Sequence, residues 1–497
     1  MRKSIRKHRA ALARTSAAVA TGVALLALAL PGPSANGQAS PGWSTYGYDV
    51  RRTGFNPTET RLLPATVGGL HRLWRVNLGG VSITSPIVAR GLMVRGAART
   101  VIYVGTEHGN LVAVNASGRV EWNRSLGSAT TTCPNTPDDV FGIGGTPVLD
   151  PVAGRLYVAV NDGASGHVFV YALDAATGKT VTGWPVSIDN DPLHMHVWGA
   201  LTLWQGTLYV TTGGMCDIPP YWGRVIAIHT ATPSIAASWS VVHVGDEVKQ
   251  GGGIWGYGGA AVESRTGDVF VATGNALGPQ PQDQPYAESV VRLDGTNLSV
   301  RAANAPKERS GPDLDFGATP LVFKTPGCPS QVVAMNKDGL MFVYLEDSIE
   351  TGPVQRIPMA KNLMEVGRFM GIPAYSPVTH LVYVTNAGPE RTPYVHGMVA
   401  FRENGSCHLV MAWQKRAGLE GNSVSTPTVA GGVVYYGDGK GQKVIAFDAG
   451  TGRRLWTSGK ALAGRAYAAP VVVNGRLYAA TWGSTGGQLV AFGLGGG

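Results

Sequence analysis

One short segment places side chains that bind metals or move protons at alternate positions. In "PLHMHVWGAL" (192–201), His194, His196 and Trp198 occupy every second residue. Alternate residues of a β-strand point to the same face, so we predict that the two imidazoles lie together and that the indole continues that face. Two such histidines suit metal binding or proton transfer. Since no third ligand accompanies them, a hydrogen-bonded structural role is the alternative.

Five more side chains with useful chemistry each stand before a segment that is rich in small residues. They are Trp255, Asp315, Arg368, Asn422 and Arg465. An aromatic surface, a carboxylate, two cations and an amide can together bind a small polar molecule. These residues are far apart in the sequence, so their chemistry depends on a fold that brings the segments to one place.

A repeated pattern predicts such a fold. The stretch "AFDAGTGRRLW" (446–456) recurs as "YALDAATGKTVTGW" (171–184) and, shortened, as "AVNASGRVEW" (113–122). Strands associated with these copies and with weaker ones carry an equivalent aromatic or apolar residue at Tyr103, Tyr157, Tyr209, Phe270, Val333, Tyr383, Tyr435 and Tyr478. These positions are roughly 43 to 63 residues apart, which is the period of a β-propeller blade with variable loops.

Eight segments such as "TSPIV", "STPTV" and "AAPVV" precede these strands. Small residues and proline suit the innermost strand, where blades crowd around an axis. The sequence therefore predicts an all-β fold, an eight-bladed β-propeller of four-stranded antiparallel blades. The chain ends without a Trp-bearing outer strand, whereas "LHRLWRVNL" (70–78) is a strand without the first half of a repeat. We predict that this N-terminal strand joins the last blade and closes the ring, which removes exposed sheet edges.

The repeats follow a separate leader. Six basic residues precede the apolar run "AAVATGVALLALAL" (17–30), and small residues follow it, a pattern typical of a signal peptide cleaved after Ala39. We predict a signal peptide at 1–39 and one propeller domain at 40–497; an uncleaved membrane anchor is the alternative. Of 41 basic residues, 35 remain after cleavage against 32 acidic ones, so most of the formal charge of +9 belongs to the leader. Nucleic acid is therefore not an expected partner.

The chain has four cysteines, Cys133, Cys216, Cys328 and Cys407, without a CxxC or a haem-attaching CxxCH motif. In an exported protein two disulfides are expected. Three pairings exist, and we favour Cys133–Cys216 with Cys328–Cys407 because each ties one repeat to a near neighbour. We predict a secreted or periplasmic, extracytoplasmic protein that is monomeric and has no membrane span after cleavage. No GxSxG, Walker A, HExxH or EF-hand motif supports a hydrolase or a nucleotide-dependent enzyme.

The repeat copies, together with the entry segment "GWSTYGYDVRRTGFNP" (42–57), resemble the pyrroloquinoline quinone (PQQ) repeat family over residues 42–497. That family includes eight-bladed quinoprotein alcohol and sugar dehydrogenases. It also includes non-catalytic scaffolds such as the outer-membrane assembly lipoprotein. The resemblance implies the fold, and it leaves catalysis to be argued from individual residues.

Resemblance to the dehydrogenases implies particular roles. The segment "GGGIWGYGGAAVESRTGDVFVATGNA" resembles the one in which a tryptophan supports the quinone and an asparagine binds calcium, here Trp255 and Asn275. "DLDFGATP" resembles the segment with the catalytic aspartate, for which Asp315 is the nearer match and Asp313 the second. Lys337 in "AMNKDGLMFVY" matches the cation at the quinone oxygens. A base, fixed cations and a flat aromatic are what alcohol oxidation by a quinone requires.

Each of these residues also has a structural alternative. Trp255 suits a wedge between blades, Asn275 and Asp315 suit turns, and Lys337 in "NKDG" suits a solvated hairpin. Two departures from the family count against a dehydrogenase. Where the calcium-binding glutamate is expected, the segment 192–201 offers histidines and no carboxylate, and imidazoles suit calcium poorly. The adjacent-cysteine disulfide of some alcohol dehydrogenases is replaced by "GTEHGN".

Two hypotheses follow. In the first, the central funnel binds PQQ and calcium and oxidises an alcohol or sugar hydroxyl, with electrons leaving to a separate acceptor. Its residues would be Asp315 and Lys337 for catalysis, Trp255, Trp198, Arg368, Asn422 and Arg465 around the cofactor, and Asn275, His194 and His196 at the cation. In the second, the protein is a non-catalytic extracellular scaffold for another protein or a wall polymer. The missing glutamate favours the second hypothesis, and the retained Trp, Asn, Asp and Lys favour the first.

Overall fold

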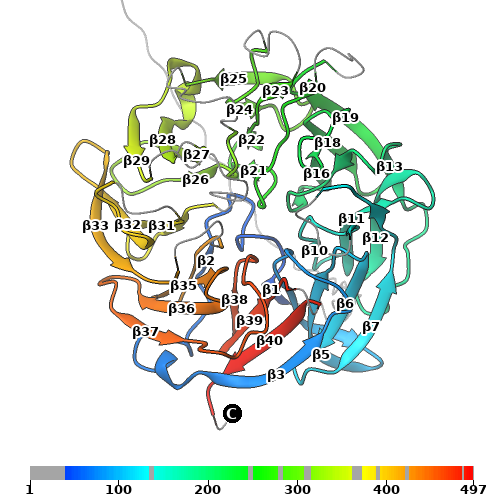
Figure 1. Cartoon of the computed structure of the whole chain (residues 1–497), viewed down its shortest axis with the longest axis horizontal. Helices are drawn as coiled ribbons and strands as arrows, with labels where there is room; N and C mark the ends of the chain where they lie inside the picture. Colours follow the sequence, from blue (N-terminus) through cyan, green and yellow to red (C-terminus); the bar gives the residue numbers. More distant parts are fainter. Residues whose placement is uncertain are drawn as a thin grey trace, which may run out of the picture. The chain divides into compact units, whose positions relative to one another are not determined.

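The computed structural model describes residues 40–133, 139–243, 250–277, 284–306, 315–337, 339–360, 372–387, 392–419, 425–483 and 486–495. The predicted signal peptide, Asp313, Arg368 and Asn422 lie outside the described residues. Within these ranges the chain consists almost entirely of strands, and eight sheets of four or five strands surround a common centre (Figure 1). The prediction of an all-β, eight-bladed propeller is confirmed. No helix in these ranges is long and apolar enough to span a membrane.

The first four blades follow one another in the sequence. Blade one contains β1 (Ser40–Trp43), β4 (Ile87–Val94), β5 (Ala97–Gly105), β6 (Asn110–Asn115) and β7 (Val120–Ser125). Blade two contains β10 (Val148–Asp150), β11 (Arg155–Asp162), β12 (His167–Asp174) and β13 (Val186–Asp189). Blade three contains β15 (Thr202–Trp204), β16 (Thr207–Thr211), β18 (Arg224–His229) and β19 (Ser234–Ser240). Blade four contains β21 (Ala261–Val262), β22 (Val269–Ala272), β24 (Val290–Leu293) and β25 (Val300–Asn304).

The last four blades repeat this order, and two of them include an N-terminal strand. Blade five contains β26 (Leu321–Phe323), β27 (Gln331–Met335), β28 (Leu340–Leu345) and β29 (Gln355–Pro358). Blade six contains β30 (Ala374–Ser376), β31 (Leu381–Asn386), β32 (Gly397–Glu403) and β33 (Leu409–Arg416). Blade seven contains β2 (Phe55–Asn56), β34 (Thr428–Ala430), β35 (Val433–Asp438), β36 (Lys443–Asp448) and β37 (Arg454–Thr457). Blade eight contains β38 (Val471–Val473), β39 (Arg476–Ala480), β40 (Gln488–Gly493) and β3 (His71–Asn77).

Smaller elements decorate this ring. Three two-stranded sheets pair β8 (Ala129–Thr130) with β9 (Val140–Phe141), β14 (Met195–His196) with β17 (Gly213–Gly214), and β20 (Gln250–Gly251) with β23 (Ala276–Leu277). Within the described residues, the named 3-10 helices are η1 (Val67–Gly69) and η4 (Glu346–Thr351). His196 lies in one of these small sheets, and Asn275 directly precedes a strand of another. Two of the predicted site residues are therefore positioned by the small sheets.

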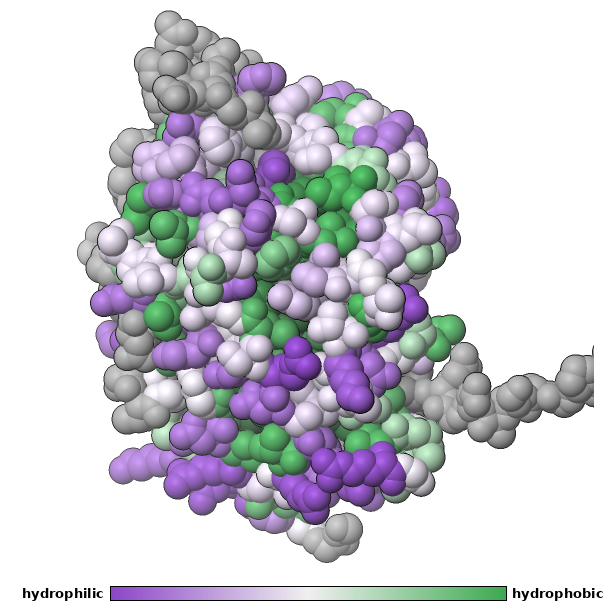
Figure 2. Space-filling model, turned by 90° about the vertical axis from the view of Figure 1, so that its right-hand side faces the viewer, coloured by the Kyte–Doolittle hydropathy of each residue, from purple (hydrophilic) through white to green (hydrophobic). Residues whose placement is uncertain are grey.

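Burial differs between middle and outer strands. Every residue of β35 is buried, because neighbouring blades cover both faces of a middle strand. The outer strand β7 instead alternates exposed with more buried residues. In a side view, hydrophobic residues on the surface are interrupted by hydrophilic ones (Figure 2).

The repeated tryptophans join neighbouring blades. Each donates an indole N–H to a backbone carbonyl in the next blade, at 2.8–3.1 Å, in the pairs Trp74–Ala116, Trp122–Ala175, Trp413–Ala449 and Trp456–Leu70. The repeated Thr-Gly turn completes this contact. A Cβ at Gly452 would overlap the ring of Trp413, and Gly452 has a φ of 70°, which favours glycine. The repeated motif therefore has a structural role, in which an indole packs on a turn that contains glycine.

The N-terminal strand β3 belongs to the last blade. It pairs antiparallel with β40, with His71 opposite Gly493 and Asn77 opposite Gln488. Its Trp74 then contacts the β6–β7 turn of blade one. Segments from the two ends of the described chain therefore share one sheet.

The segment between β1 and β3 contacts the inner strands of most blades in turn. Carbonyls of this segment accept backbone N–H groups at 2.7–3.4 Å in the pairs Ser44–Leu149, Val50–Val262, Arg51–Val322, Thr53–Tyr375 and Gly54–Val429. The strand β2 then runs parallel to β34, and Asn56 Nδ2 donates to Val472 O at 2.7 Å. Figure 1 shows this N-terminal segment, in blue, at the centre of the ring. These hydrogen bonds fix the inner strands of different blades to one continuous piece of chain.

Arg52 anchors the same segment to blade three. Its side chain is completely buried and donates to Thr45 Oγ1 and Tyr46 O, both at 2.7 Å. It also donates to Leu201 O and to the hydroxyl of Thr202. Burial lowers the pKa of Arg52 to about 10, and the charge of Asp49 opposes that shift. The guanidinium therefore stays charged at neutral pH and depends on these oxygens for its solvation.

Two disulfides link successive blades. Cys133–Cys216 and Cys328–Cys407 have Cα–Cα distances of 5.7 and 5.6 Å, and the predicted pairing is confirmed. The first joins chain that flanks blade two to the β16–β18 connection of blade three. The second joins the β26–β27 connection of blade five to the β32–β33 connection of blade six.

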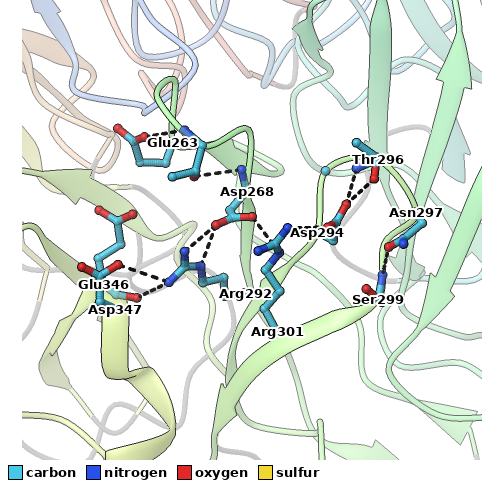
Figure 3. Close-up of polar contacts among 12 residues, drawn as sticks. Glu263, Asp268, Arg292, Asp294, Thr296, Asn297, Ser299, Arg301, Glu346 and Asp347 are labelled. Atoms are coloured by element: carbon cyan, nitrogen blue, oxygen red, sulfur yellow. Dashed lines mark hydrogen bonds and ion pairs between the residues drawn. The ribbon is translucent and has the colours of Figure 1, made fainter.

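An ion-pair network joins blades four and five (Figure 3). Asp268 contacts Arg292 at 2.5 Å and Arg301 at 3.0 Å, all within blade four. Arg292 also donates to Glu346 O at 3.0 Å, in the helix η4 that follows β28. Because Asp268 is almost fully buried, its two arginine partners are needed to offset the loss of solvation. The network fixes the relative positions of the two blades that carry Trp255 and Asp315.

We predict that Arg52→Met will lower the free energy of unfolding by about 3 kcal/mol, because it removes a buried charge and leaves its acceptors without a donor. Urea unfolding of the purified protein measures this. Arg51→Ala is the matched control, since the backbone bond from Val322 to residue 51 is retained. Equal stability of the two variants would contradict the anchoring role of Arg52.

Candidate functional site

A buried ion pair lies at the start of blade five. Asp315 precedes β26, and Lys337 lies in the β27–β28 turn. Lys337 Nζ lies 2.5 Å from Asp315 Oδ2, and the Lys337 backbone N–H donates to Asp315 O at 2.9 Å. Both side chains are buried, with exposed fractions of 6% and 1%. Lys337 is thus a buried partner of the carboxylate, and the solvated hairpin alternative does not describe it.

Blade four supplies the other side of this pair. The backbone N–H of Asn275 donates to Asp315 Oδ1 at 2.7 Å. A Cβ at Gly274 would overlap both Asp315 Oδ1 and Trp255 Nε1. The absence of a side chain at Gly274 therefore lets the carboxylate and the indole approach the same backbone position. We use the name hub for Trp255, Asn275, Asp315 and Lys337. The name also covers the turns of the other blades that are equivalent to the Lys337 turn of blade five.

Two polar atoms of the hub lack hydrogen-bond partners among the described residues. They are the side-chain oxygen Oδ1 of Asn275 and the indole nitrogen Nε1 of Trp255, and both are buried. Burying a polar atom without a partner costs about 1–3 kcal/mol. Such atoms next to a buried carboxylate point to a ligand that completes their hydrogen bonds.

The two predicted histidine ligands have different surroundings. His194 Nδ1 lies 2.8 Å from Asp191 Oδ2 and is partly exposed. His196 is buried, with its ring centroid 3.4 Å from that of Phe141 and 4.5 Å from that of Trp198. The ranges described above contain no group of three His, Cys, Asp or Glu side chains that could hold a metal ion.

His196 is held in its neutral form. Burial lowers the pKa of His196 well below 6.5. Its Nδ1 lies 3.4 Å from Asn161 Oδ1, and its Nε2 has no hydrogen-bond partner within the described ranges. Trp198 donates from Nε1 to Gly214 O at 3.0 Å, which fixes the aromatic wall beside this imidazole.

Blade eight contributes an aromatic and cationic group. The guanidinium of the predicted residue Arg465 lies 5.5 Å from the ring centroid of Trp482 and 5.9 Å from that of Tyr467. Arg465 and Trp482 also exchange two backbone hydrogen bonds, at 2.7 and 2.9 Å. Arg465 is exposed, so this group presents a charge to solvent.

The sequence analysis did not identify several polar residues that lie at the same end of the propeller axis as Asp315 and Lys337. The main ones are Glu107, Tyr257, Tyr467 and Trp482. Glu107 lies in "GTEHGN", where the sequence showed only that a disulfide was missing. Glu107 could have been found from its position in the repeat, because the β5–β6 turn of blade one is equivalent to the turn that carries Lys337 in blade five.

A separate cavity lies beside the N-terminal segment. It has a volume of about 390 Å³ and is lined by Tyr48, Asp49, Arg51, Leu149 and Trp204, among others. None of the hub residues lines it, so it carries no argument about the ion pair.

The propeller fold has relatives among known proteins. Residues 68–234 and 410–497, just over half of the chain, match a PQQ-repeat family model described as outer membrane protein assembly factor BamB. No curated protein sequence matches significantly.

Similar solved structures include both enzymes and a protein described only as BamB. The quinohemoprotein alcohol dehydrogenase ADHIIG of Pseudomonas putida HK5 is 17% identical, with a TM-score of 0.67 over 92% of this chain and 81% of that one. A europium-containing methanol dehydrogenase is 15% identical, with a TM-score of 0.69 over 91% and 98%. BamB from Moraxella catarrhalis is 13% identical, with a TM-score of 0.53 over 85% and 99%. At these identities the likeness establishes the fold alone.

We predict that Lys337→Met will lower the free energy of unfolding by about 3 kcal/mol, because it leaves the Asp315 carboxylate buried without its cation. The double variant Asp315→Asn/Lys337→Met should recover part of that loss. Urea unfolding at pH 7 measures both, with Lys324→Met, an exposed lysine of the same blade, as the control. A loss no larger than that of the control would refute the buried pair.

We also predict that His196 makes the protein less stable as the pH falls below 6.5. The unfolded imidazole takes up a proton there while the folded one does not, so the unfolded state gains up to about 1.4 kcal/mol per pH unit. Unfolding curves of wild type and His196→Leu between pH 5.5 and 7.5 should therefore converge as the pH falls. Replacing the exposed His229 by Leu is the control. A pH-independent difference between wild type and His196→Leu would contradict the neutral buried state.

Proposed function

This chain belongs to the PQQ-like repeat family of β-propellers, and on that basis we propose that its hub binds a quinone cofactor of the PQQ type and oxidises an alcohol or sugar hydroxyl. The observation that carries this proposal is the buried pair of Asp315 and Lys337 beside Trp255. A carboxylate, a fixed cation and a flat aromatic in one buried place match the needs of that reaction.

The side chains of the hub fit the organic part of such a cofactor. Trp255 offers an aromatic surface, and its Nε1 and the Asn275 Oδ1 offer a donor and an acceptor without partners within the described ranges. Lys337 offers a cation for a carbonyl oxygen. When bound, a quinone of this type would accept the hydrogen on the substrate carbon together with two electrons, as a hydride.

The fit to calcium is weaker. Calcium takes six to eight oxygen ligands. Of Trp255, Asn275, Asp315 and Lys337, Asn275 and Asp315 carry side-chain oxygens, and the segment in which a glutamate was expected carries the buried, neutral His196. Most ligands of a calcium ion at this place would therefore have to come from the cofactor and from water.

The residues of the hub have separate tasks in the proposed reaction. Asp315 accepts the proton of the substrate hydroxyl. Lys337 Nζ and the Asn275 backbone N–H contact that carboxylate and fix its position. Burial of the pair excludes water, which strengthens both interactions. The sequence has no haem-attachment motif, so an enzyme of this kind would need a separate electron acceptor.

The proposed setting is extracytoplasmic. The two disulfides support it, because such bonds persist in oxidising compartments. The pattern of the first 39 residues, interpreted as a signal peptide, agrees with this setting.

A non-catalytic scaffold is the second candidate. The lack of a carboxylate beside His196 favours it, because a hub without a cation site polarises a quinone less well. In that case the blade connections or a face of the ring would bind another extracellular protein or a wall polymer. The hub residues would then serve only the stability of blades four and five.

We predict that the purified protein, mixed with PQQ and calcium, will bind PQQ at micromolar concentration and reduce a dye when alcohols or aldoses are added. Trp255→Ala should lose PQQ binding, because the ring loses its support. Asp315→Asn should keep binding and lose about 10²–10⁴-fold in turnover, because the base is gone. Absorbance of the quinone and dye reduction measure the two effects.

Trp456→Ala is the matched control, since this tryptophan joins blades seven and eight outside the hub. It should bind PQQ like the wild type. If the wild type binds no PQQ with or without calcium, the enzyme proposal is wrong and the scaffold function stands. If Asp315→Asn turns over normally, Asp315 is not the base.

A further inference from the structure

Glu107 lies across the hub from the Asp315–Lys337 pair. It occupies the β5–β6 turn of blade one, and Lys337 occupies the β27–β28 turn of blade five. Each blade has four antiparallel strands in sequence order from the centre outward, except that β3 is the outer strand of blade eight, with β1 added inside blade one and the parallel strand β2 added inside blade seven. Both turns connect the second and third of these four strands. The two turns therefore lie at the same end of the axis. Figure 1 shows β5 and β6 on the opposite side of the centre from β27 and β28.

The carboxyl group of Glu107 is buried and incompletely hydrogen-bonded. The residue is 2% exposed, and its backbone N–H donates to Val81 O at 2.9 Å. The side chain accepts a hydrogen bond from Trp482. Its Oε2 has no partner in the described parts of the chain. A buried carboxyl oxygen without a partner is costly, and a ligand that hydrogen-bonds there would offset that cost.

The same burial decides the charge of this group. Burial raises the pKa of Glu107 to about 8, against the opposing effect of the Trp482 hydrogen bond. The carboxyl is therefore mostly protonated at pH 7 and becomes ionised as the pH rises through 8. A protonated carboxyl donates a hydrogen bond, and it does not repel an anion as a carboxylate would.

The neighbours of Glu107 connect it to the ion pair. Burial raises the pKa of Tyr257, and the nearby Tyr467 and Glu107 add to that shift. Tyr257 belongs to the same short segment as Trp255, whose indole nitrogen shares the Gly274 position with Asp315. The group around Glu107 thus continues, through Tyr257 and Trp255, to the carboxylate of blade five.

The charged and titratable groups around Glu107 come from three blades. His108 adjoins it on the same turn, Tyr257 comes from blade four, and Tyr467 and the exposed Arg465 come from blade eight. Arg465 is stacked on Tyr467 and on Trp482, the donor to Glu107. Trp482, which donates to Glu107, therefore lies among aromatic rings and beside the guanidinium of Arg465, which attracts anions.

We propose that Glu107 is a second binding residue of the hub, which donates a hydrogen bond from its carboxyl group to a carbonyl or carboxylate oxygen of the bound quinone. This inference rests on the proposed function. It also defines the class of ligand. The ligand is a planar anion or polyketone that contacts Lys337 on one side and the neutral carboxyl of Glu107 on the other. A cationic or purely apolar ring would leave the Glu107 proton without an acceptor.

The affinity for PQQ should then depend on the proton of Glu107. Replacement by alanine removes the donor and should weaken PQQ binding about tenfold at pH 7. Glu107→Gln keeps a donor of similar size and should bind within a few-fold of the wild type. Above pH 8 the wild type should lose affinity, by up to about tenfold per pH unit, because the carboxyl ionises. The glutamine variant should not show this loss.

Titration of PQQ, followed by quenching of tryptophan fluorescence from pH 6.5 to 9.5, tests these effects in the full exported protein. Glu350→Gln, at an exposed glutamate, is the matched control. Circular dichroism of each variant establishes that it is folded. The glutamine variant also guards against misfolding, since it changes the side chain least.

The outcomes separate this inference from the function on which it rests. If the wild type binds no PQQ at any pH, the proposed function fails and the role of Glu107 fails with it. If the wild type binds PQQ and Glu107→Ala binds equally well, only the role of Glu107 is wrong. Equal weakening in the alanine and glutamine variants would also overturn it. Loss of affinity above pH 8 in wild type and Glu350→Gln, and not in Glu107→Gln, supports it.

Discussion

The hydrogen bonds between the N-terminal segment and the inner strands are the constraint on which the rest of this structure depends. A propeller places its functional side chains on different blades, so their spacing is only as well defined as the positions of those blades. Here one stretch of chain, from Ser44 to Asn56, bonds to strands of six blades, and Arg52 anchors it to a seventh. The outer tryptophans repeat the same task at the blade joints. Together these contacts turn eight similar sheets into one rigid frame.

The candidate site uses this frame at the joint between blades four and five. Gly274 brings an indole from one blade and a carboxylate from the next to the same backbone position, and Lys337 neutralises the carboxylate. A buried pair of this kind contributes little net stability, because desolvation offsets the attraction. Its persistence beside polar atoms without partners in the described structure is easier to explain by chemistry than by folding. The network around Asp268 links the same two blades at a second place.

The sequence predicted the features that repeat and missed those that arise only in three dimensions. The blade count follows from local patterns that recur at a regular period, and the disulfide pairing follows from linking each repeat to a near neighbour. The buried state of Lys337 does not, because its "NKDG" turn resembles a solvated hairpin until Asp315 is placed beside it. His196 was paired with His194 by alternation along a strand, yet its immediate contacts are Phe141 and Trp198. Glu107 belongs to no recognised sequence motif. Its proposed role in binding follows only from its position across the propeller axis from blade five.

The central claim is that residues from opposite blades converge on one planar ligand in the hub. A crystal structure of the protein with PQQ and calcium tests this most directly. We predict planar density against Trp255, with one oxygen near Lys337 Nζ and another near the carboxyl of Glu107. Density confined to the cavity lined by Tyr48 and Trp204, or no density at all at saturating PQQ, would contradict it.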